Sequence, residues 1–441
     1  MNAKIEFKAE LALNENYDVI VVGGGPSGCS AAAAAGREGA KTLLIEATGA
    51  LGGMGTSGLV PAWCPFTDKE KIIYGGIAET VLKKCIAGMP HVKEDCFDWT
   101  PIDSELLKRI YDDLVIDNSS DIIFNTQLSA VNMSGNKVDS IIVSNKAGLS
   151  AYKAAVYIDC TGDADLASWA GAQFEKGDED GDLQPATHCF KLANVDEYAY
   201  ATEPTLHPAN PKSLIYKIKA EGKYPLIPDF HCCNNLVGPG VVGFNAGHLW
   251  EVDNTDPVSI SKGLILGRKI AHQFQLALAE YAPKTFASAF LVSTASLIGI
   301  RETRRIIGDY YLTVKEMMEF KSYEDEICRN CYFIDVHHAQ KEVGTNKEGA
   351  STCYRFPPGK SHGIPYRCLT PKGIKNILMA GRSISTDRSA QGSTRVMPVC
   401  LAMGEAAGIA AKMATMSDNN VHKVNTGELR EKLRNRGAYL P

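Results

Sequence analysis

The feature that most constrains the fold is a glycine-rich turn between a buried strand and a helix near the start of the chain. Residues 17–22 form a short β-branched run, which is typical of a buried parallel strand. This run leads into Gly23-Gly24-Gly25-Pro26-Ser27-Gly28, which fits the pattern G-x-G-x-x-G, and then into an alanine-rich helix over residues 29–36. Residues 41–45 form a second strand, which ends at Glu46. This order of elements predicts a βαβ unit that binds a dinucleotide.

The residues of this unit have separate physical roles. Gly23 permits the tight turn, Gly25 allows the backbone to approach a pyrophosphate, and Gly28 allows the helix to lie close to the strand. The start of the helix offers N–H groups and a positive dipole end to the phosphates. Glu46 follows at the distance expected of the acid that bonds the ribose hydroxyls.

A second stretch, Gly238-Pro239-Gly240-Val241-Val242-Gly243, fits the same glycine pattern. Residues 232–235 before it are polar and do not predict a strand, and residues 244–248 after it start no helix. We therefore interpret this stretch as a loop or a strand end, and not as a second nucleotide site.

Length and composition narrow the class of protein. A chain of 441 residues suits two domains that share one interface. With 46 basic and 51 acidic side chains and no basic block, the sequence predicts neither a nucleic-acid nor a membrane partner. The first 16 residues do not have the pattern of a secretory signal, and the apolar stretch 19–35 is interrupted by glycines and a proline. The 13 cysteines are scattered, which favours reduced thiols and a cytoplasmic location.

Segments far from the first glycine loop decide between the possible dinucleotides. The βαβ unit alone suits NAD or FAD, but FAD is long, and its flavin end needs contacts from distant parts of the chain. One candidate is the loop over residues 51–58. Another is the strand 155–160, which opens into Thr161-Gly162-Asp163. A last candidate is the strand 377–380 with the residues that follow it up to 398. These segments favour FAD.

Read together, these segments resemble the FAD-dependent oxidoreductases of the glutathione-reductase-like fold. More narrowly, they are similar to the bacterial branch related to the fumarate reductase and succinate dehydrogenase flavoproteins. The most diagnostic stretches are residues 299–305, 364–369 and 380–408, and the resemblance extends from residue 17 to about residue 412. It implies an α/β fold, in which a Rossmann-like FAD-binding domain carries an inserted α+β substrate domain.

The resemblance also implies a set of FAD-binding residues. In it, Leu128 would meet the adenine through its backbone, and Arg382, Arg395 and Val396 would lie at the flavin end. The whole set is Gly23, Gly25, Pro26, Ser27, Gly28, Glu46, Ala47, Gly52, Gly53, Met54, Thr56, Leu128, Thr161, Gly162, Asp163, Gly381, Arg382, Arg395 and Val396. Relatives with covalent flavin attach it through a histidine after the position of Glu46. No histidine occurs between Glu46 and Cys64, so we expect FAD to be bound non-covalently.

The predicted domains follow from this arrangement. Residues 17–189 and 363–441 form the FAD-binding domain, and residues 190–362, which lack regular βαβ alternation, form the substrate or cap domain. Within the first domain, residues 122–162 predict several strands, with a hairpin at Ser134-Gly135-Asn136. Within the second, residues 306–312 predict a strand, and Thr313 and Glu316 have capping-box spacing before a helix toward Phe320.

The last long helix is expected over residues 398–416. Pro398 suits a first helical position, and Gly404 and Gly408 share a face that permits close packing. The family resemblance implies that the start of this helix points at the pyrimidine edge of the flavin, where its dipole would stabilise the reduced, anionic form. A simple core helix is the other interpretation, and both can hold.

The basic residues Arg301, Arg304 and Arg305 form the densest cationic cluster, and Arg367, Arg388 and Arg395 follow downstream. Arginine binds carboxylates with two parallel hydrogen bonds, so a cluster that faces the flavin would suit an organic acid. The alternative is that Glu302 and other acids neutralise these arginines in structural ion pairs. We select Arg301 and Arg395 as candidate catalytic residues.

Asp335 and His337 would lie on one face of an extended segment, with His338 on the other face. Such a pair could orient His337 as a general acid or base, and the alternative is a histidine at the surface or at a domain contact. Cys328-Arg329-Asn330-Cys331 has C-x-x-C spacing, but no second pair completes a metal site, so we predict ordinary thiols and no metal. The adjacent Cys232 and Cys233 are interpreted in the same way.

Three functions remain open at this point. The first is hydride transfer between FAD and a small metabolite, which could carry a carboxylate, with an unidentified electron partner. The second is a flavin monooxygenase or oxidase. The third is FAD as a structural or sensing ligand within a larger complex. Direct reduction by NAD(P)H in a dedicated domain is not expected. Pyridine-nucleotide disulfide reductases carry a pair of redox cysteines and a second dinucleotide-binding pattern. Here Cys64 stands alone in its region, and the second glycine pattern lacks a strand before it and a helix after it.

Overall fold

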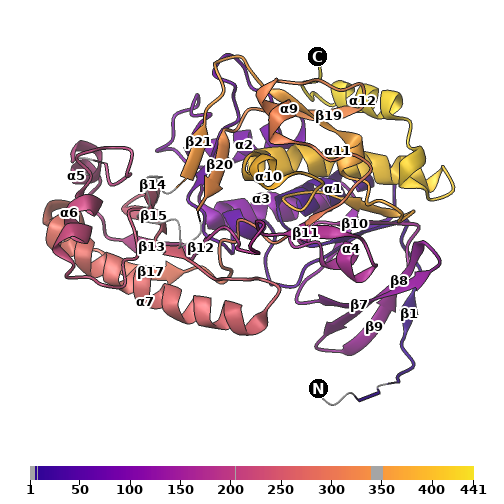
Figure 1. Cartoon of the computed structure of the whole chain (residues 1–441), viewed down its shortest axis with the longest axis horizontal. Coiled ribbons are helices and arrows are strands. Elements are labelled where there is room, and N and C mark those ends of the chain that lie inside the picture. Colours follow the sequence, from indigo (N-terminus) through magenta and orange to yellow (C-terminus); the bar gives the residue numbers. More distant parts are fainter. Residues whose placement is uncertain (1–4, 7, 204, 339–350) are drawn as a thin grey trace.

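The computed structural model describes the chain except residues 1–4, 7, 204 and 339–350 (Figure 1). At its centre lies a five-stranded sheet with the order β23-β10-β2-β3-β6, in which all neighbours are parallel. The strands are β2 (Val19–Val22), β3 (Thr42–Ile45), β6 (Ser120–Ile123), β10 (Val156–Asp159) and β23 (Ile377–Met379). Every residue of β2, β3 and β10 is buried, because both faces of a parallel sheet are covered.

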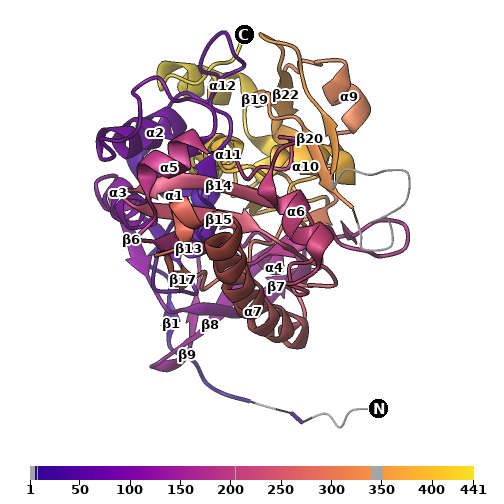
Figure 2. The same ribbon diagram turned by 90° about the vertical axis from the view of Figure 1, so that its left-hand side faces the viewer.

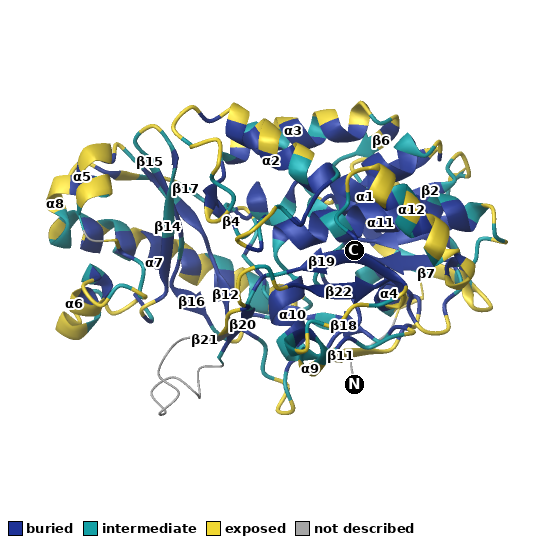
Figure 3. Cartoon of the chain, turned by 90° about the horizontal axis from the view of Figure 1, so that it is seen from above, coloured by how far each residue is buried: buried dark blue, intermediate teal, exposed yellow. Residues whose placement is uncertain are grey.

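Two helices pack on the same side of this sheet, α1 (Pro26–Arg37) and α11 (Met397–Thr415). They approach closely because α11 has glycines at the contact: a Cβ added to Gly404 or Gly408 would lie 2.2 Å from a backbone oxygen of α1. By length and composition α11 could span a membrane, but 89% of its apolar window is buried inside the fold, and Figure 3 shows it among buried elements. Other helices around this core are α2 (Ile77–Ala87), α3 (Ser104–Ile116), α4 (Asp165–Trp169) and α12 (Thr426–Asn435).

A β-meander lies below the sheet in Figure 1, away from α1 and α11. Its strands are β7 (Gln127–Ser134), β8 (Lys137–Asn145) and β9 (Gly148–Tyr152), and the short β1 (Leu13–Asn14) pairs with β9. The predicted hairpin at Ser134-Gly135-Asn136 is confirmed, since Ser134 pairs with Lys137 and Gly135 has a φ of +62°.

A second antiparallel sheet has the order β14-β15-β13-β17. Its strands are β13 (Phe190–Ala193), β14 (Cys232–Gly238), β15 (Val241–Ala246) and β17 (Phe290–Thr294). The long helix α7 (Pro257–Tyr281) lies across its outer side in Figure 2. The helices α5 (Glu197–Thr202), α6 (Leu214–Glu221) and α8 (Pro283–Phe286) complete this part. Its hydrophobic core is separate from that of the parallel sheet.

The two hydrophobic cores can be compared with the predicted domain boundaries at residues 190 and 362. These boundaries stay a prediction. Buried apolar side chains of the second core come from Ala186 through Ile300. Those from Ile306 through Ile364 pack instead with the core of the parallel sheet. The packing therefore indicates a second unit that is shorter at its C-terminal end than the predicted substrate domain.

The remaining elements are short. The paired strands are β4 (Ala62–Trp63) with β5 (Thr100–Pro101), β11 (Phe174–Lys176) with β18 (Arg304–Ile306), β12 (Ala186–Thr187) with β16 (His248–Leu249), β19 (Glu326–Asn330) with β22 (His362–Pro365), and β20 (Ile334–His337) with β21 (Ser351–Tyr354). The short helices are α9 (Val314–Met318), α10 (Arg388–Thr394), η1 (Gly53–Gly55), η3 (Tyr366–Cys368) and η4 (Val421–Lys423).

Two local predictions were wrong. Residues 306–312 were expected to form a strand, but β18 ends at Ile306, and only isolated bridges at Gly308 and Leu312 follow. The apolar residues there are buried by packing and not by strand pairing. Residues 232–235 were expected not to form a strand, yet they begin β14. Their polar side chains are accommodated because Asn234 accepts a hydrogen bond from Tyr200 and Asn235 donates one to the backbone of Trp99.

Two other local predictions are confirmed. The second glycine pattern, at residues 238–243, forms the turn between β14 and β15 and the start of β15, with Gly240 at a φ of +63°. Thr313 and Glu316 form the capping box of α9, which is shorter than expected and ends at Met318.

Candidate functional site

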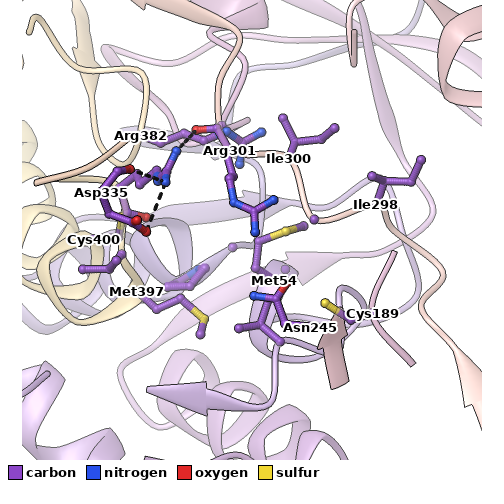
Figure 4. A pocket seen from close by; sticks show the side chains of 18 of the residues that line it. Met54, Cys189, Asn245, Ile298, Ile300, Arg301, Asp335, Arg382, Met397 and Cys400 are labelled. Carbon is purple, nitrogen blue, oxygen red and sulfur yellow. Dashed lines mark hydrogen bonds and ion pairs between the residues drawn. The ribbon is translucent and has the colours of Figure 1, made fainter. Parts of the chain in front are cut away.

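A single cavity of about 2060 Å³ runs between the parallel sheet and the second sheet. Its wall includes residues at the carboxyl ends of three strands of the parallel sheet, among them Val22, Ile45 and Cys160. Ligands of open α/β sheets bind at this edge, where the strand order reverses. The opposite wall comes from the second unit and includes Asn245, Ile298 and Ile300, which Figure 4 shows around the same space.

The glycine turn lies at one end of the cavity. Gly23 has a φ of +96°, in the region that favours glycine, and a Cβ at Gly28 would lie 1.8 Å from the carbonyl oxygen of Gly23. A Cβ at Gly25 would meet nothing within 4 Å, and Gly25, Pro26 and Ser27 line the cavity. The helix α1 has no side-chain cap at its first turn. Its N–H groups are therefore available to a phosphate in the cavity.

Glu46 and Ala47 line the cavity next to this turn. Glu46 is buried, and its carboxylate accepts hydrogen bonds from the backbone N–H of Gly24 at 2.6 Å and from the backbone and hydroxyl of Thr48 at 2.8 and 2.7 Å. These contacts fix the carboxylate, whose oxygens have further lone pairs for ribose hydroxyls.

The predicted residues in the loop after Glu46 fall into two groups, those that line the cavity and those that hold the loop in shape. Gly53 and Met54 line the cavity. Gly52 and Thr56 hold the loop in shape: Gly52 has a φ of +100° and donates to the carbonyl of Gly24, and the Thr56 hydroxyl donates to the carbonyl of Leu51 at 2.6 Å. These two residues act behind the cavity wall.

The middle segment brings Leu128, Thr161, Gly162 and Asp163 to the cavity. Asp163 pairs with Arg382 at 2.7 Å. Gly162 has a φ of +80°, and a Cβ there would lie 2.5 Å from the guanidinium of Arg382. The Nε of Arg382 is buried without a hydrogen-bond partner among the described residues. A buried donor of this kind is expected to face a ligand or water.

The C-terminal segment completes the cavity wall with Gly381, Arg395, Val396 and Met397. The helix α11 begins here with Val396 as its N-cap and no side-chain cap. Two helix N-termini without side-chain caps, those of α1 and α11, therefore line the same cavity. Both supply partial positive charge to an anionic group.

The arginines separate into two sets. Arg304 pairs with Asp165, Arg305 and Arg388 both pair with Glu302, and Arg367 pairs with Asp325. For these four the structural interpretation holds. Arg301 and Arg395 line the cavity, as Arg304 also does, but among the described residues Arg301 donates to neutral groups only.

Arg301 and Arg395 both line the cavity and lie close enough for their charges to interact. Arg301 donates to the carbonyl of Pro185 at 2.7 Å and to the hydroxyl of Thr187 at 2.9 Å, and Figure 4 shows its guanidinium pointing toward Met54 and Asn245. Burial and the nearby charge of Arg395 lower the pKa of Arg301 to about 10, so it stays protonated at neutral pH. Arg395 donates to the backbone oxygen of Asp335 at 2.7 Å and lies 3.5 Å from its carboxylate.

His337 lies beside these arginines, as part of a cluster that the sequence did not predict. Its Nε2 is 3.3 Å from the carboxylate of Asp335, and its Nδ1 is 2.8 Å from Nε2 of His248. His248 is bonded through Nδ1 to Asp229, and the ring of His231 stacks on His248. Burial first, and the charge of Arg301 second, lower the pKa of His337 to about 3. His337 is buried and does not lie at the surface.

The residues missed by sequence reasoning are Asp229, His231 and His248. They come from a loop and from β16, while His337 belongs to β20. One local signal was present, because Asp229-x-His231 repeats the spacing of Asp335-x-His337.

The comparisons with known proteins decide the family. A sequence model described as FAD dependent oxidoreductase matches residues 18–433. The chain belongs to this family. Its cofactor is FAD, and its parallel sheet with the glycine turn after β2 is the Rossmann-like α/β fold of FAD-binding flavoproteins.

Individual relatives are distant. Glutathione reductase of Schizosaccharomyces pombe is 37% identical over 91 residues, which cover 20% of this chain and 18% of that enzyme. A geranylgeranyl bacteriochlorophyll reductase-like protein of Thermoplasma acidophilum aligns over 97% of this chain and 85% of its own, with 13% identity and a TM-score of 0.49. The p-nitrophenol 4-monooxygenase of Pseudomonas putida aligns over 96% of this chain and 84% of its own, with 11% identity and a TM-score of 0.45.

Several features of the cavity suit FAD. Gly25 leaves open space in front of it, two helix N-termini without side-chain caps line the cavity, and Arg382 has a buried donor without a protein partner. Of the predicted FAD-binding residues, all line the cavity except Gly28, Gly52 and Thr56, which shape its wall. The individual roles, the non-covalent attachment and the cytoplasmic location stay predictions.

The cysteine prediction can be placed in the structure. Cys328 is buried, and Cys331 donates to the carbonyl of Thr67. Burial raises the pKa of Cys331 to about 12 and that of Cys328 further above its usual range. Thiols with raised pKa values are poor nucleophiles, which fits the interpretation as ordinary thiols.

Proposed function

We propose that this FAD-dependent oxidoreductase transfers a hydride between FAD and a small metabolite that carries a carboxylate. The observation that carries the proposal is Arg301, a cationic side chain in the cavity wall whose hydrogen-bond partners among the described residues are a carbonyl, a hydroxyl and an imidazole. The imidazole is that of His231, whose pKa burial holds well below its usual range, so it is neutral as well. A half-buried cation with neutral partners favours an anionic ligand.

The pairing of charges around Arg301 supports a carboxylate as that ligand. Of the two nearby carboxylates, Asp335 lies 3.5 Å from Arg395 and Asp229 bonds His248, so each has another partner. A substrate carboxylate would meet the planar guanidinium of Arg301. Apolar side chains of Met54, Ile298 and Ile300 would contact the rest of a small substrate.

FAD supplies the two-electron chemistry, and the protein binds and orients the substrate. The segments that line the nucleotide end of the cavity would hold the cofactor. Arg301 and Arg395 would fix the carboxylate, which limits the orientations in which the reacting carbon is presented.

The test is anaerobic photoreduction of the FAD-loaded protein, followed by mixing with a panel of 2-oxo and 2-enoic acids. We expect at least one acid to restore the absorbance of oxidised flavin faster than buffer does, and its amide analogue to be slower. Reoxidation by oxygen alone would support the monooxygenase or oxidase alternative instead. Reoxidation by no compound would support FAD as a structural or sensing ligand.

Variants sharpen this test. Arg301→Ala is expected to keep the flavin absorbance and to lose the response to the acid by about a hundredfold, since a charge-assisted pair is worth about 1.5–3 kcal/mol. The matched control is Arg367→Ala, because Arg367 pairs with Asp325 and stacks on Tyr310 outside the cavity. Loss of the flavin itself in Arg301→Ala would contradict the assigned role.

A further inference from the structure

Four side chains next to Arg301, three of them buried and Asp335 half-buried, form a continuous chain. Asp229 bonds Nδ1 of His248, Nε2 of His248 lies 2.8 Å from Nδ1 of His337, and Nε2 of His337 lies 3.3 Å from Asp335. All four line the cavity. Two carboxylates thus flank two imidazoles that contact each other.

The histidines His231, His248 and His337 lie close enough for a metal ion, with their ligand atoms within 4.8 Å of one another. Their ring planes do not suit one. The rings of His231 and His248 are stacked 4.3 Å apart with only 12° between their planes, so lone pairs in these planes cannot meet at one ion. His231 also faces the guanidinium of Arg301 at 3.2 Å, which repels a cation. The arrangement favours hydrogen bonds over metal binding.

A count of protons identifies the reactive position in this chain. The three contacts need three protons, but two neutral imidazoles carry only one N–H each and ionised carboxylates carry none. Burial lowers the pKa of His248 as well as that of His337, so both are neutral. Although burial alone would raise it, the pKa of Asp335 lies well below its usual range, and the nearby charges of Arg395 and Arg301 keep the carboxylate ionised. One contact therefore has no proton. We assign it to the longest of the three contacts, which joins Nε2 of His337 to Asp335.

We propose that Nε2 of His337 is the proton acceptor of the reaction, and that His248 and Asp229 relay the proton away from it. Asp229 sets the direction of the chain, because its carboxylate requires the proton of His248 on Nδ1. Nε2 of His248 then accepts from Nδ1 of His337, which leaves Nε2 of His337 with a lone pair beside Asp335.

The proton and the electron pair separate as follows. When an alcohol of the substrate is oxidised, its C–H bond would break with the electron pair, and bound FAD would supply the chemistry that accepts the pair as hydride. The O–H proton passes to Nε2 of His337. The Nδ1 proton of His337 then moves to His248, and the Nδ1 proton of His248 moves to Asp229. In the reducing direction each transfer is reversed. This role rests on the proposed hydride transfer, and His248 and Asp229 are positioning residues in it.

The relay can be tested by nuclear magnetic resonance of the FAD-loaded protein with ¹⁵N-labelled histidine. At neutral pH we expect His248 and His337 to be neutral, each with its proton on Nδ1. In Asp229→Asn both are expected to move that proton to Nε2. The reason is that Oδ1 of Asp229 accepts the backbone N–H groups of His231 and His248, so the new amide nitrogen would face Nδ1 of His248. A donor there inverts the tautomer, as it does in hydrolase triads.

The control is Asp325→Asn, which removes a buried carboxylate outside the cavity and should leave both tautomers unchanged. The relay is wrong if wild-type His337 carries its proton on Nε2, or if Asp229→Asn leaves the tautomer of His337 unchanged. Tight binding of Zn²⁺ that is lost in His248→Gln would also overturn it. No substrate enters this measurement, so its failure is distinct from failure of the acid screen.

Discussion

Gly25 and Gly28 are three residues apart in the same turn, yet a methyl group would meet different surroundings at the two positions. At Gly28 it would lie 1.8 Å from the backbone of Gly23, whereas at Gly25 it would project into open space of the cavity. Gly25 has a φ of −70°, which alanine adopts without strain. The two positions therefore separate folding from cofactor binding.

We predict that Gly25→Ala folds normally and binds FAD about tenfold more weakly or worse, a loss of about 1.4 kcal/mol or more. The methyl group would occupy the space in which the pyrophosphate approaches the backbone. Gly28→Ala is expected to lose about 3 kcal/mol of stability from overpacking. Thermal unfolding of the apo proteins and FAD titration followed by flavin fluorescence measure the two effects. Unchanged FAD affinity in Gly25→Ala would argue against a pyrophosphate at this turn.

At the scale of whole helices, Glu405 of α11 connects its own helix to α1 and α2. It is only 2% exposed, pairs with Arg37 of α1 at 2.6 Å, and accepts the backbone N–H of Ile77 at the start of α2. We predict that Glu405→Gln costs about 2–3 kcal/mol, because removal of the charge leaves the half-buried Arg37 without its partner. The matched control is Glu79→Gln, whose partner Lys83 is exposed and whose pair is worth about 0.5 kcal/mol. Equal losses in the two variants would contradict this assignment.

The capping box of α9 gives a prediction with a defined pH dependence. Although burial acts in the opposite direction, hydrogen bonds from Lys321, Tyr310 and Thr313 lower the pKa of Glu316 to about 2, from 4.5 for an unperturbed carboxyl group. A carboxylate with a lowered pKa in the folded state adds stability above pH 4.5, and this stability is lost as the pH falls from 4.5 toward 2.

Glu316→Gln is therefore expected to lower stability by about 1 kcal/mol at pH 7, a value reduced for its partial exposure. Its difference from wild type should shrink as the pH falls below 4.5. Melting temperatures of both proteins between pH 7 and pH 3 measure this change. A difference that is constant over the range would show that the charge of Glu316 is not the cause.

What the sequence could predict at this scale depends on how local the cause is. The unit β2–turn–α1–β3 was predictable because its glycines and its buried strands act within one short segment. β14 was missed because Asn234 and Asn235 look polar in sequence, while their partners, Tyr200 and Trp99, lie far away in the chain. Residues 306–312 were taken for a strand because an apolar run does not reveal whether pairing or packing buries it.

For the whole molecule, the site depends on contacts between two hydrophobic cores. The sequence predicted Arg301, Arg395 and His337 individually, but not which other arginines would be neutralised. It could not predict that His231 and His248 meet His337, because 89 residues separate the two histidines that are hydrogen-bonded. Contacts of this kind form when the second sheet packs against the first. No single segment of the sequence carries a pattern that predicts them.

The same arrangement predicts an uneven response of the molecule to FAD. The first part of α7, with Pro257, Ile260 and Leu264, reaches the cavity, whereas its remaining residues to Tyr281 do not line it. Hydrogen exchange of apo and FAD-loaded protein should therefore show strong protection in peptides over residues 19–60 and 380–400, and little change in residues 266–281. Protection follows because binding stabilises the folded segments that contact the ligand, by about 2.7 kcal/mol at a hundredfold excess over Kd. Equal protection along α7 would show that FAD orders the second unit as a whole, and no protection at α1 would place the cofactor elsewhere.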